Sequence, residues 1–276
     1  NTRGALVRSI RHGIPGTPMP AFPDEVLTAA QRDALADFVI AFGPPGTVVE
    51  PGESVLHVVD RPVVVRGMLP PLGEGDVKVQ RGLLVGFPTG TTFEYRVDDV
   101  QLRALRQGEF VDRRDWGDRG GLELRPLGQV LRDLRASNAA YDAQTAAWDG
   151  RRALRGTEVV GASVIVRYDL LDPRVGLIGR GEERLRVVET PVGPVPTRAL
   201  RHVQVDGSTA AAQPQAGARL EAAFRGPSGA ALHVHRVDAG IFRVAVPDGA
   251  GHVVHLVYAE RWTPALEALV TPEAAR

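Results

Sequence analysis

The spacing of apolar residues along the chain changes near residue 43. Upstream of that point, apolar residues recur at helical spacing, first at Leu6, Val7 and Ile10 and then at Leu35, Phe38, Val39 and Phe42. This spacing predicts one amphipathic helix closed by His12 and Gly13, and a second helix over residues 29–42. Thr28 and Gln31 have the spacing of a capping box at the start of the second helix. Gly and Pro residues at 43–46 end it.

Downstream of residue 46 the period becomes two, which is typical of β-strands, and it is clearest at residues 163–168. Strands are expected at 55–59, 62–67, 77–87, 92–97, 109–113, 158–168, 184–190, 198–205, 219–224, 231–237, 241–246 and 252–258. Residues 136–150 fit either a short helix or an irregular insertion, and 264–270 fit a short closing helix. The expected fold is therefore mainly β, with a small all-α part (residues 1–43) and a large antiparallel β-sandwich domain (residues 44–276).

Composition narrows the functional classes. Of 276 residues 43% are hydrophobic, which supplies a core and excludes a disordered chain. The 33 basic and 33 acidic residues balance, so we expect no nucleic-acid partner. We also expect no transmembrane segment, because no apolar run approaches the ~18 residues that span a bilayer. The chain has no cysteine, which excludes disulfides, thiolate metal sites and thioether attachment of a cofactor to this chain.

Catalytic motifs are absent from the sequence. It contains no nucleophile elbow and no phosphate-binding glycine loop. Glu182 and Glu183 are adjacent, so on a strand they point to opposite faces, unlike the facing carboxylates of a glycosidase. His233 and His235 share a strand face, and without a third ligand we interpret them as a solvated or hydrogen-bonded pair rather than a metal site. His252 and His255 are expected on opposite faces.

The most specific motif is the loop at residues 15–22, Pro-Gly-Thr-Pro-Met-Pro-Ala-Phe, followed by the second helix. It resembles the C-terminal half of a class I c-type cytochrome domain. The resemblance implies that Met19 is the distal ligand of a haem c iron, and that Pro18, Pro20 and Phe22 contact this cofactor. The Cys-x-x-Cys-His segment of the family is missing, and the resemblance places it upstream of Asn1. An unrelated Pro/Met turn between two helices is the alternative.

Residues downstream carry a second resemblance. The segments are 61–67, 82–88, 93–98, 108–112 and 116–121. They look like a poorly characterised β-rich domain that occurs beside cytochrome c modules in large periplasmic or secreted bacterial proteins. This resemblance implies a context, not an activity.

Trp116, Asp118 and Arg119 form a candidate ligand contact within that domain. An indole face beside a carboxylate and a guanidinium suits a sugar ring, which stacks its apolar side and hydrogen-bonds its hydroxyls. The alternative is a Gly-rich turn in which Asp118 caps the backbone and Arg119 pairs with Asp112 or Asp115.

Together these features predict part of a multidomain, periplasmic or extracellular bacterial protein. It would transfer electrons through haem c, and this chain itself would be non-catalytic. Its β domain would dock a redox partner protein, an upstream dehydrogenase domain or a polysaccharide. A carbohydrate-binding or carbohydrate-active β-sandwich protein, with the cytochrome as its electron outlet, is the alternative function.

Overall fold

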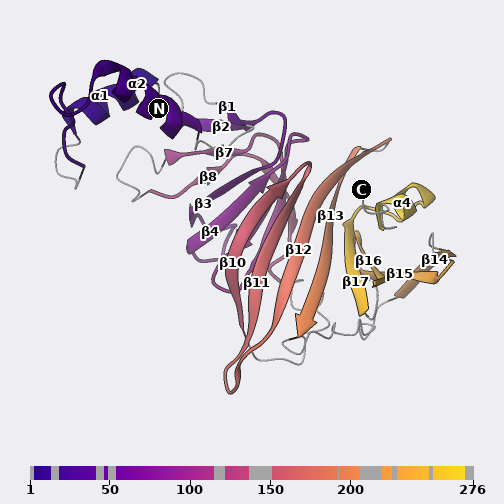
Figure 1. The fold of residues 1–276 in the computed structure, drawn as a ribbon. Coiled ribbons are helices and arrows are strands. Elements are labelled where there is room, and N and C mark those ends of the chain that lie inside the picture. The colour runs from indigo at the N-terminus through magenta and orange to yellow at the C-terminus, as the bar shows by residue number, and fades with distance from the viewer. Residues whose placement is uncertain are drawn as a thin grey trace.

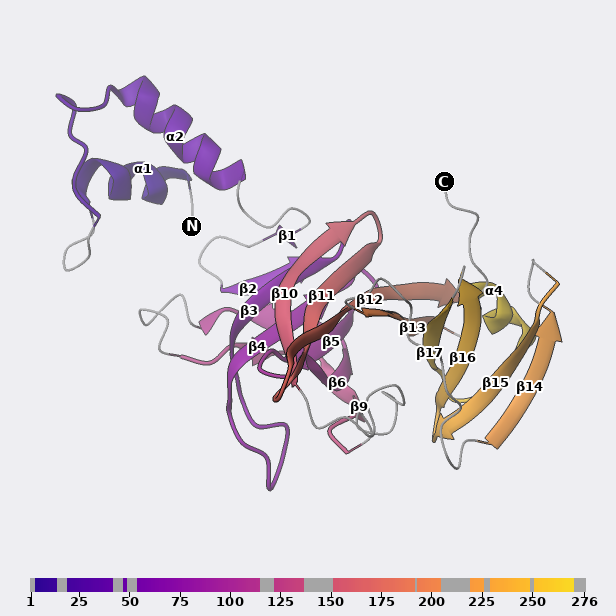
Figure 2. The same cartoon turned by 60° about the horizontal axis from the view of Figure 1, so that its bottom comes forward.

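The computed structural model describes residues 3–13, 19–41, 47–48, 54–114, 122–136, 151–191, 193–204, 219–225, 229–248 and 251–270. Two helices come first, α1 (Arg3–His12) and α2 (Ala29–Ala41). They form where the apolar spacing predicts helices, and Gly13 follows α1 directly. Figure 1 and Figure 2 place this helix pair at one end of the molecule, with the last strands at the other.

The described residues after the helices are arranged mainly in three antiparallel sheets. A small sheet has the order β1-β2-β7-β8, with β1 (Thr47–Val48), β2 (Val55–Val58), β7 (Val111–Asp112) and β8 (Arg125–Pro126). A five-stranded sheet has the order β3-β4-β5-β6-β9, with β3 (Val63–Leu69), β4 (Val79–Gly86), β5 (Thr91–Arg96), β6 (Gln101–Gln107) and β9 (Gln129–Asp133).

The third sheet is eight-stranded, with the order β10-β11-β12-β13-β17-β16-β15-β14. Its first half consists of β10 (Arg151–Val160), β11 (Ser163–Asp172), β12 (Gly176–Thr190) and β13 (Gly193–Gln204). Its second half consists of β14 (Arg219–Arg225), β15 (Ala231–Asp238), β16 (Ile241–Asp248) and β17 (Gly251–Tyr258). The closing helix is present as a 3-10 turn (Pro264–Leu266) that continues into α4 (Glu267–Val270).

Three apolar clusters hold the layers together. The largest joins the five-stranded sheet to the eight-stranded sheet and includes Phe93 and Val166. A second lies between the five-stranded sheet and the small sheet and includes Leu84 and Leu56. The third covers the far half of the eight-stranded sheet with the closing helix and Trp262. The mainly β, sandwich-like architecture expected from the period-two pattern is therefore confirmed.

The expected strand at 158–168 is wrong. The chain turns at Gly161 and Ala162, where Gly161 has a φ of 57°, and residues on either side pair as the hairpin β10–β11. The alternation runs through this turn without a break, so the period alone does not show that the chain reverses. Glycine adopts a positive φ at little steric cost, which makes it the residue that allows a tight turn here.

The sequence pattern also missed strands. β6 and β9 lie outside every expected strand, and β12 begins eight residues before the expected start at 184. β6 reads Gln-Leu-Arg-Ala-Leu-Arg-Gln, and a bulge near Tyr95 breaks its pairing with β5. A bulge shifts the face on which each later residue lies, so strict alternation is lost although the strand is intact.

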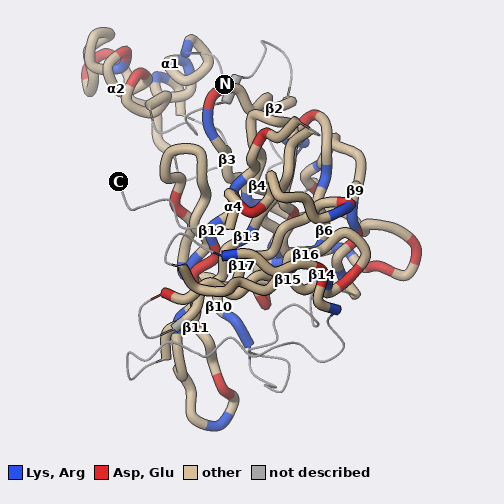
Figure 3. Tube along the Cα trace, turned by 90° about the vertical axis from the view of Figure 1, so that its right-hand side faces the viewer, with Lys and Arg blue, Asp and Glu red and all other residues tan. Residues whose placement is uncertain are grey.

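Charges are distributed over the whole fold. Figure 3 shows Lys and Arg interspersed with Asp and Glu along the described chain. No helix among the described residues is long and apolar enough to cross a membrane.

Candidate functional site

The Met19 loop is closed against the end of α1. Gly13 has a φ of 68°, and a Cβ on it would lie 2.9 Å from both the backbone N of Ala21 and the carbonyl O of Met19. The backbone N–H of Phe22 donates to the carbonyl of Ile10 at 3.0 Å. Gly13 therefore allows the returning chain to pack on the helix end, which fixes the backbone of Met19. Pro18 lies outside the described residues.

The start of α2 has the predicted capping box. The backbone N–H of Thr28 donates to Oε1 of Gln31 at 2.9 Å, and the backbone N–H of Gln31 donates to Oγ1 of Thr28 at 3.3 Å. Each side chain thus satisfies a backbone donor that the first turn leaves without a partner.

Arg32 is the residue of this region that the sequence analysis missed. Its side chain is only 3% exposed. It donates to the carbonyl O of Phe22 at 3.3 Å, to the carbonyl O of Leu27, and to the carboxylate of Asp24. Arg32 therefore holds the segment between the Met19 loop and α2 in place. Nothing in the sequence indicates that the guanidinium group of this helical arginine is buried.

The apolar face expected on α2 forms but is not covered by the described parts of the chain. Leu35, Phe38 and Val39 are 37%, 60% and 40% exposed, whereas Ala36 is fully buried. Ile10 of α1 and Ala36 of α2 are buried, and Arg3 of α1 also contacts Asp33 and Asp37 of α2 at 3.2 and 2.6 Å. Met19 and Phe22 are half-buried and Pro20 is exposed.

These residues fit one side of a haem site. The thioether of Met19 is a soft ligand that suits haem iron, and its loop is anchored at both ends. The exposed apolar side chains of α2 suit contact with an apolar macrocycle. His12, the histidine nearest to Met19 in the sequence, is exposed at the end of α1. No group of three or more His, Cys, Asp or Glu side chains that could hold a metal ion exists within the described ranges.

Trp116, Asp118 and Arg119 lie outside the described residues, so the proposed sugar contact stays a prediction. Of its alternative partners, Asp112 is described. It accepts a hydrogen bond from Ser54 and lies 3.7 Å from Arg114.

The histidine pairs are arranged as the register predicts. His233 and His235 lie on one face of β15, with ring centroids 6.5 Å apart. Burial lowers the pKa of His235, and Arg243 and His233 add to the effect. His252 and His255 pair with Pro247 and Val244, an odd separation that puts them on opposite faces of β17. Burial, reinforced by Arg186, lowers the pKa of His255 to about 4.

A buried polar cluster joins the two large sheets at Glu183, which is fully buried. Its Oε2 accepts hydrogen bonds from the hydroxyl of Tyr95 at 2.9 Å and from Arg198 at 2.8 and 3.2 Å. Arg198 also donates to the hydroxyl of Tyr258 at 3.1 Å. Burial, reinforced by Glu183 despite the opposing charge of Arg198, raises the pKa of Tyr95. Tyr95 therefore stays protonated at neutral pH, and its hydroxyl donates a hydrogen bond to Glu183.

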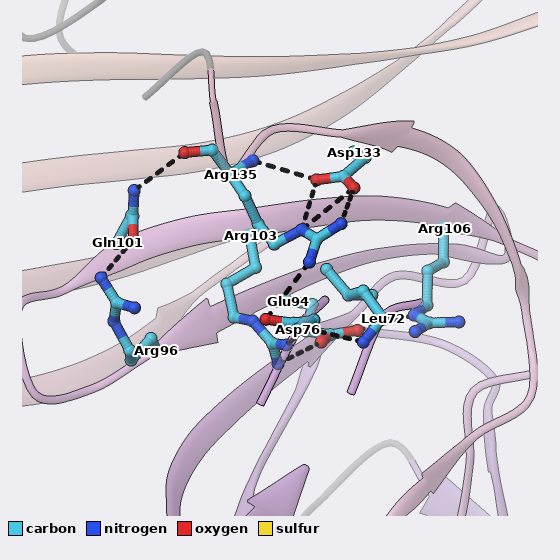
Figure 4. A network of polar contacts seen from close by, with 9 residues as sticks. All are labelled: Leu72, Asp76, Glu94, Arg96, Gln101, Arg103, Arg106, Asp133 and Arg135. Carbon is cyan, nitrogen blue, oxygen red and sulfur yellow. Dashed lines mark hydrogen bonds and ion pairs between the residues drawn. The ribbon is translucent and has the colours of Figure 1, made fainter. Parts of the chain in front are cut away.

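A second buried network lies on the opposite face of the five-stranded sheet (Figure 4). Glu94 is fully buried, and its two oxygens accept from Arg103 at 2.8 Å and from Arg106 at 2.7 Å. Arg103 also contacts Asp76 at 2.5 Å. Burial opposes ionisation of Asp76, but hydrogen bonds from the backbone N–H groups of Leu72 and Val77, together with Arg103, lower its pKa from 3.8 to about 2.

In both networks arginines neutralise a buried carboxylate. We interpret these pairs as part of the fold's internal support and not as a reactive site. Glu182 and Glu183 face opposite sides of β12 as predicted, since the first is exposed and the second is buried. The burial of Glu183 and Glu94 was not predicted from the sequence. For Glu183 the sequence does hold a signal, because it lies two residues before Leu185 and therefore on the same core-facing side of β12.

Comparison with known proteins adds no family to this description. No family model and no curated protein matches the chain. Among solved structures, it is similar to "Dihydro-heme d1 dehydrogenase NirN in complex with DHE", with 13% sequence identity over 91% of this chain and 69% of that chain, and a TM-score of 0.15. A TM-score this low does not establish a common fold. The fold and site thus define a mainly β protein of antiparallel sheets with an N-terminal helix pair.

Proposed function

We propose that this chain takes part in electron transfer, with Met19 as the distal ligand of a haem iron. The observation that carries the proposal is the anchoring of the Met19 loop, which Gly13 fixes at one end and Arg32 at the other. When bound, haem supplies one-electron redox chemistry at its iron. The proposal includes a Cys-x-x-Cys-His segment upstream of Asn1, since this chain has no cysteine for covalent attachment.

The residues of this chain have separate tasks in that proposal. Met19 presents a neutral, soft thioether, which favours reduced iron and raises the reduction potential. Gly13 and Arg32 hold the backbone of the Met19 loop in one position, so that little conformational entropy is lost when the thioether binds iron. Leu35, Phe38 and Val39 of α2 exclude water from an apolar partner, which explains why the helix carries a face that the described chain leaves exposed.

The β domain is proposed to be a non-catalytic docking module for a partner protein, a dehydrogenase domain or a polysaccharide. Its buried carboxylates support this assignment over a carbohydrate-active enzyme. Glu94 and Glu183 are each bound by arginines inside the fold, whereas glycosidase carboxylates face each other across a cleft at ~5–9 Å. Haem attachment of this type leads us to propose a periplasmic or extracellular location.

A ligand-substitution experiment tests the haem assignment. The gene product that includes the upstream segment is expressed with its haem, and Met19→Ala is compared with Met68→Ala, the only other methionine in the sequence. Met68 is a half-buried residue of β3, which makes it a matched control. We expect Met19→Ala to change the low-spin visible spectrum and to lower the reduction potential, and Met68→Ala to change neither. An unchanged spectrum and potential in Met19→Ala would contradict the assignment.

A further inference from the structure

A hollow of about 320 Å³ lies on the outer face of the eight-stranded sheet, over β10 to β13. The strand register identifies this face. Arg167, Glu182 and Arg201 are directly opposite one another on three adjacent strands, and the alternate residues on these strands are buried against the five-stranded sheet. The residues that line the hollow and matter here are Arg155, Arg167, Arg180, Arg201, Glu182 and Val203.

Four guanidinium groups therefore surround one depression, although the chain has no net charge. Each comes from a different strand of the same sheet, since Arg155, Arg167, Arg180 and Arg201 belong to β10, β11, β12 and β13. Among the lining residues only Glu182 opposes them. The carboxylates that pair with the arginines, apart from Glu182, do not line the hollow.

The internal partners of these arginines are weak. Arg155 and Arg180 lie 3.6 and 3.8 Å from the same carboxylate oxygen, Oδ1 of Asp169, and Arg201 lies 3.4 Å from Asp248. None of these contacts meets hydrogen-bond geometry, and the side chains of Arg155, Arg180 and Arg201 are 47%, 65% and 51% exposed. Of the four arginines, Arg167 is the one with side-chain hydrogen bonds in the described parts of the chain, to Glu158 at 2.7 Å and to Glu182 at 3.3 Å.

This donor set indicates the chemistry of a ligand. A planar guanidinium binds a carboxylate through two parallel N–H···O bonds, which suits a ligand that carries several carboxylates. Glu182 lies between Arg167 and Arg201 and repels an anion, but it accepts hydrogen bonds from hydroxyl groups. The combination favours a molecule that has both carboxylates and hydroxyls. A hollow of this volume is at the lower end of the range for small-ligand sites.

We propose that this hollow binds an acidic oligosaccharide, whose uronate carboxylates contact Arg155, Arg180 and Arg201 and whose hydroxyls contact Glu182. This names a ligand class for the docking role proposed for the β domain and rests on that part of the proposal, but it uses no residue of the Met19 loop. A phosphate ligand is less favoured here. The backbone N–H groups that often bind phosphate are used here in strand pairing.

The test uses tetragalacturonic acid as the probe, with maltotetraose as its neutral counterpart and sodium phosphate as a simple oxyanion. The whole chain is titrated in a calorimeter at low salt, and the titration is repeated at higher salt. The variants are Arg180→Ala and Arg201→Ala. Arg81→Ala is the matched control, because Arg81 is about as exposed as Arg180 (70% and 65%) and has one long ion pair, to Asp98 at 3.5 Å, but lies outside the hollow. Circular dichroism and urea unfolding confirm that each variant is folded.

We expect binding of tetragalacturonic acid that weakens with salt, and no binding of maltotetraose. Loss of one charged hydrogen-bond donor should weaken binding about 10-fold in Arg180→Ala and in Arg201→Ala. Arg81→Ala should bind like the parent chain. The proposal is overturned if tetragalacturonic acid does not bind, if maltotetraose binds equally well, if phosphate binds more tightly than tetragalacturonic acid, or if Arg81→Ala loses as much affinity as the other two. These outcomes leave the haem proposal untouched, since that depends on the spectrum of Met19→Ala.

Discussion

The helix pair and the β-sheets differ in the kind of side chain that they bury. In the sheets, apolar side chains such as Phe93 are buried in shared cores and most exposed positions are polar. In the helix pair, the buried positions include a charged residue, Arg32, while Phe38 and Val39 are exposed. The sheets are therefore held mainly by apolar burial, whereas the helix pair buries few apolar residues, Ile10 and Ala36 among them, and adds caps, ion pairs and arginine–carbonyl hydrogen bonds.

The comparison teaches that polar contacts differ in value with their surroundings. The ion pairs that connect α1 to α2 are about half-exposed, so water screens them and each contributes little to stability. The arginine–carboxylate contacts inside the sheets are shielded from water, and removal of one partner leaves an uncompensated buried charge. We expect the helix pair to unfold at a lower free energy than the sheets. Three predictions test this.

The largest effect is expected inside the sandwich, for Glu183→Gln. The change removes the charge that balances Arg198 between the two large sheets, and breaking a buried pair in this way costs ~3–5 kcal/mol. Urea unfolding followed by near-UV circular dichroism measures the loss. Glu182→Gln is the neighbouring control on the outer face and should cost under ~1 kcal/mol. Equal effects of the two variants would show that buried and exposed pairs do not differ here.

An intermediate effect is expected from acid. The pKa of Asp76 is about 2 in the folded chain and 3.8 in the unfolded chain. Asp76 therefore stabilises the fold fully above pH 3.8. This stabilisation, ~2 kcal/mol, is lost as the pH falls from about 4 to 2. The free energy of unfolding, measured by urea over this pH range, should fall less steeply in Asp76→Asn.

Asp98→Asn serves as the control for the acid experiment, because Asp98 is exposed in a turn and pairs with Arg81 only at 3.5 Å. It should leave the pH dependence close to that of the parent chain. An identical slope in Asp76→Asn and the parent would remove Asp76 from this account.

The smallest effect is expected in the helix pair, for Thr28→Ala. Loss of the cap leaves the backbone N–H of Gln31 without its side-chain acceptor and should cost ~1 kcal/mol. Hydrogen exchange should show less protection of the α2 amides, while the amides of β11 keep theirs. If the amides of both elements lose protection equally, the helix pair and the sheets unfold together, and the proposed difference between them is wrong.

Sequence reasoning succeeded where local rules apply. The capping box at Thr28 and Gln31, the end of α1 at Gly13 and the opposite orientations of Glu182 and Glu183 depend on residues within a few positions of one another. The strands β14 to β17 were also predicted closely. The reasoning failed at β6, where a bulge breaks the period, and at Gly161, where the alternation hides a reversal of the chain.

The two candidate sites also differ in whether neighbouring residues in the sequence reveal them. Met19 stands out in the sequence because its prolines and the following cap are contiguous. The four arginines of the hollow span residues 155 to 201, and nothing in their spacing indicates that four adjacent strands bring them together.

The sequence by itself determined the mainly β class, the helix boundaries and which face of a regular strand each residue occupies. Only the tertiary structure decided which faces are covered. Glu94 and Arg167 both lie on the side of their sheet that faces away from the shared core. Glu94 is nevertheless buried and linked through Arg103 to Asp76 of loop 72–77, whereas Arg167 is exposed. The physical reason is that alternation fixes the direction of a side chain locally, while burial depends on which distant segment packs over it.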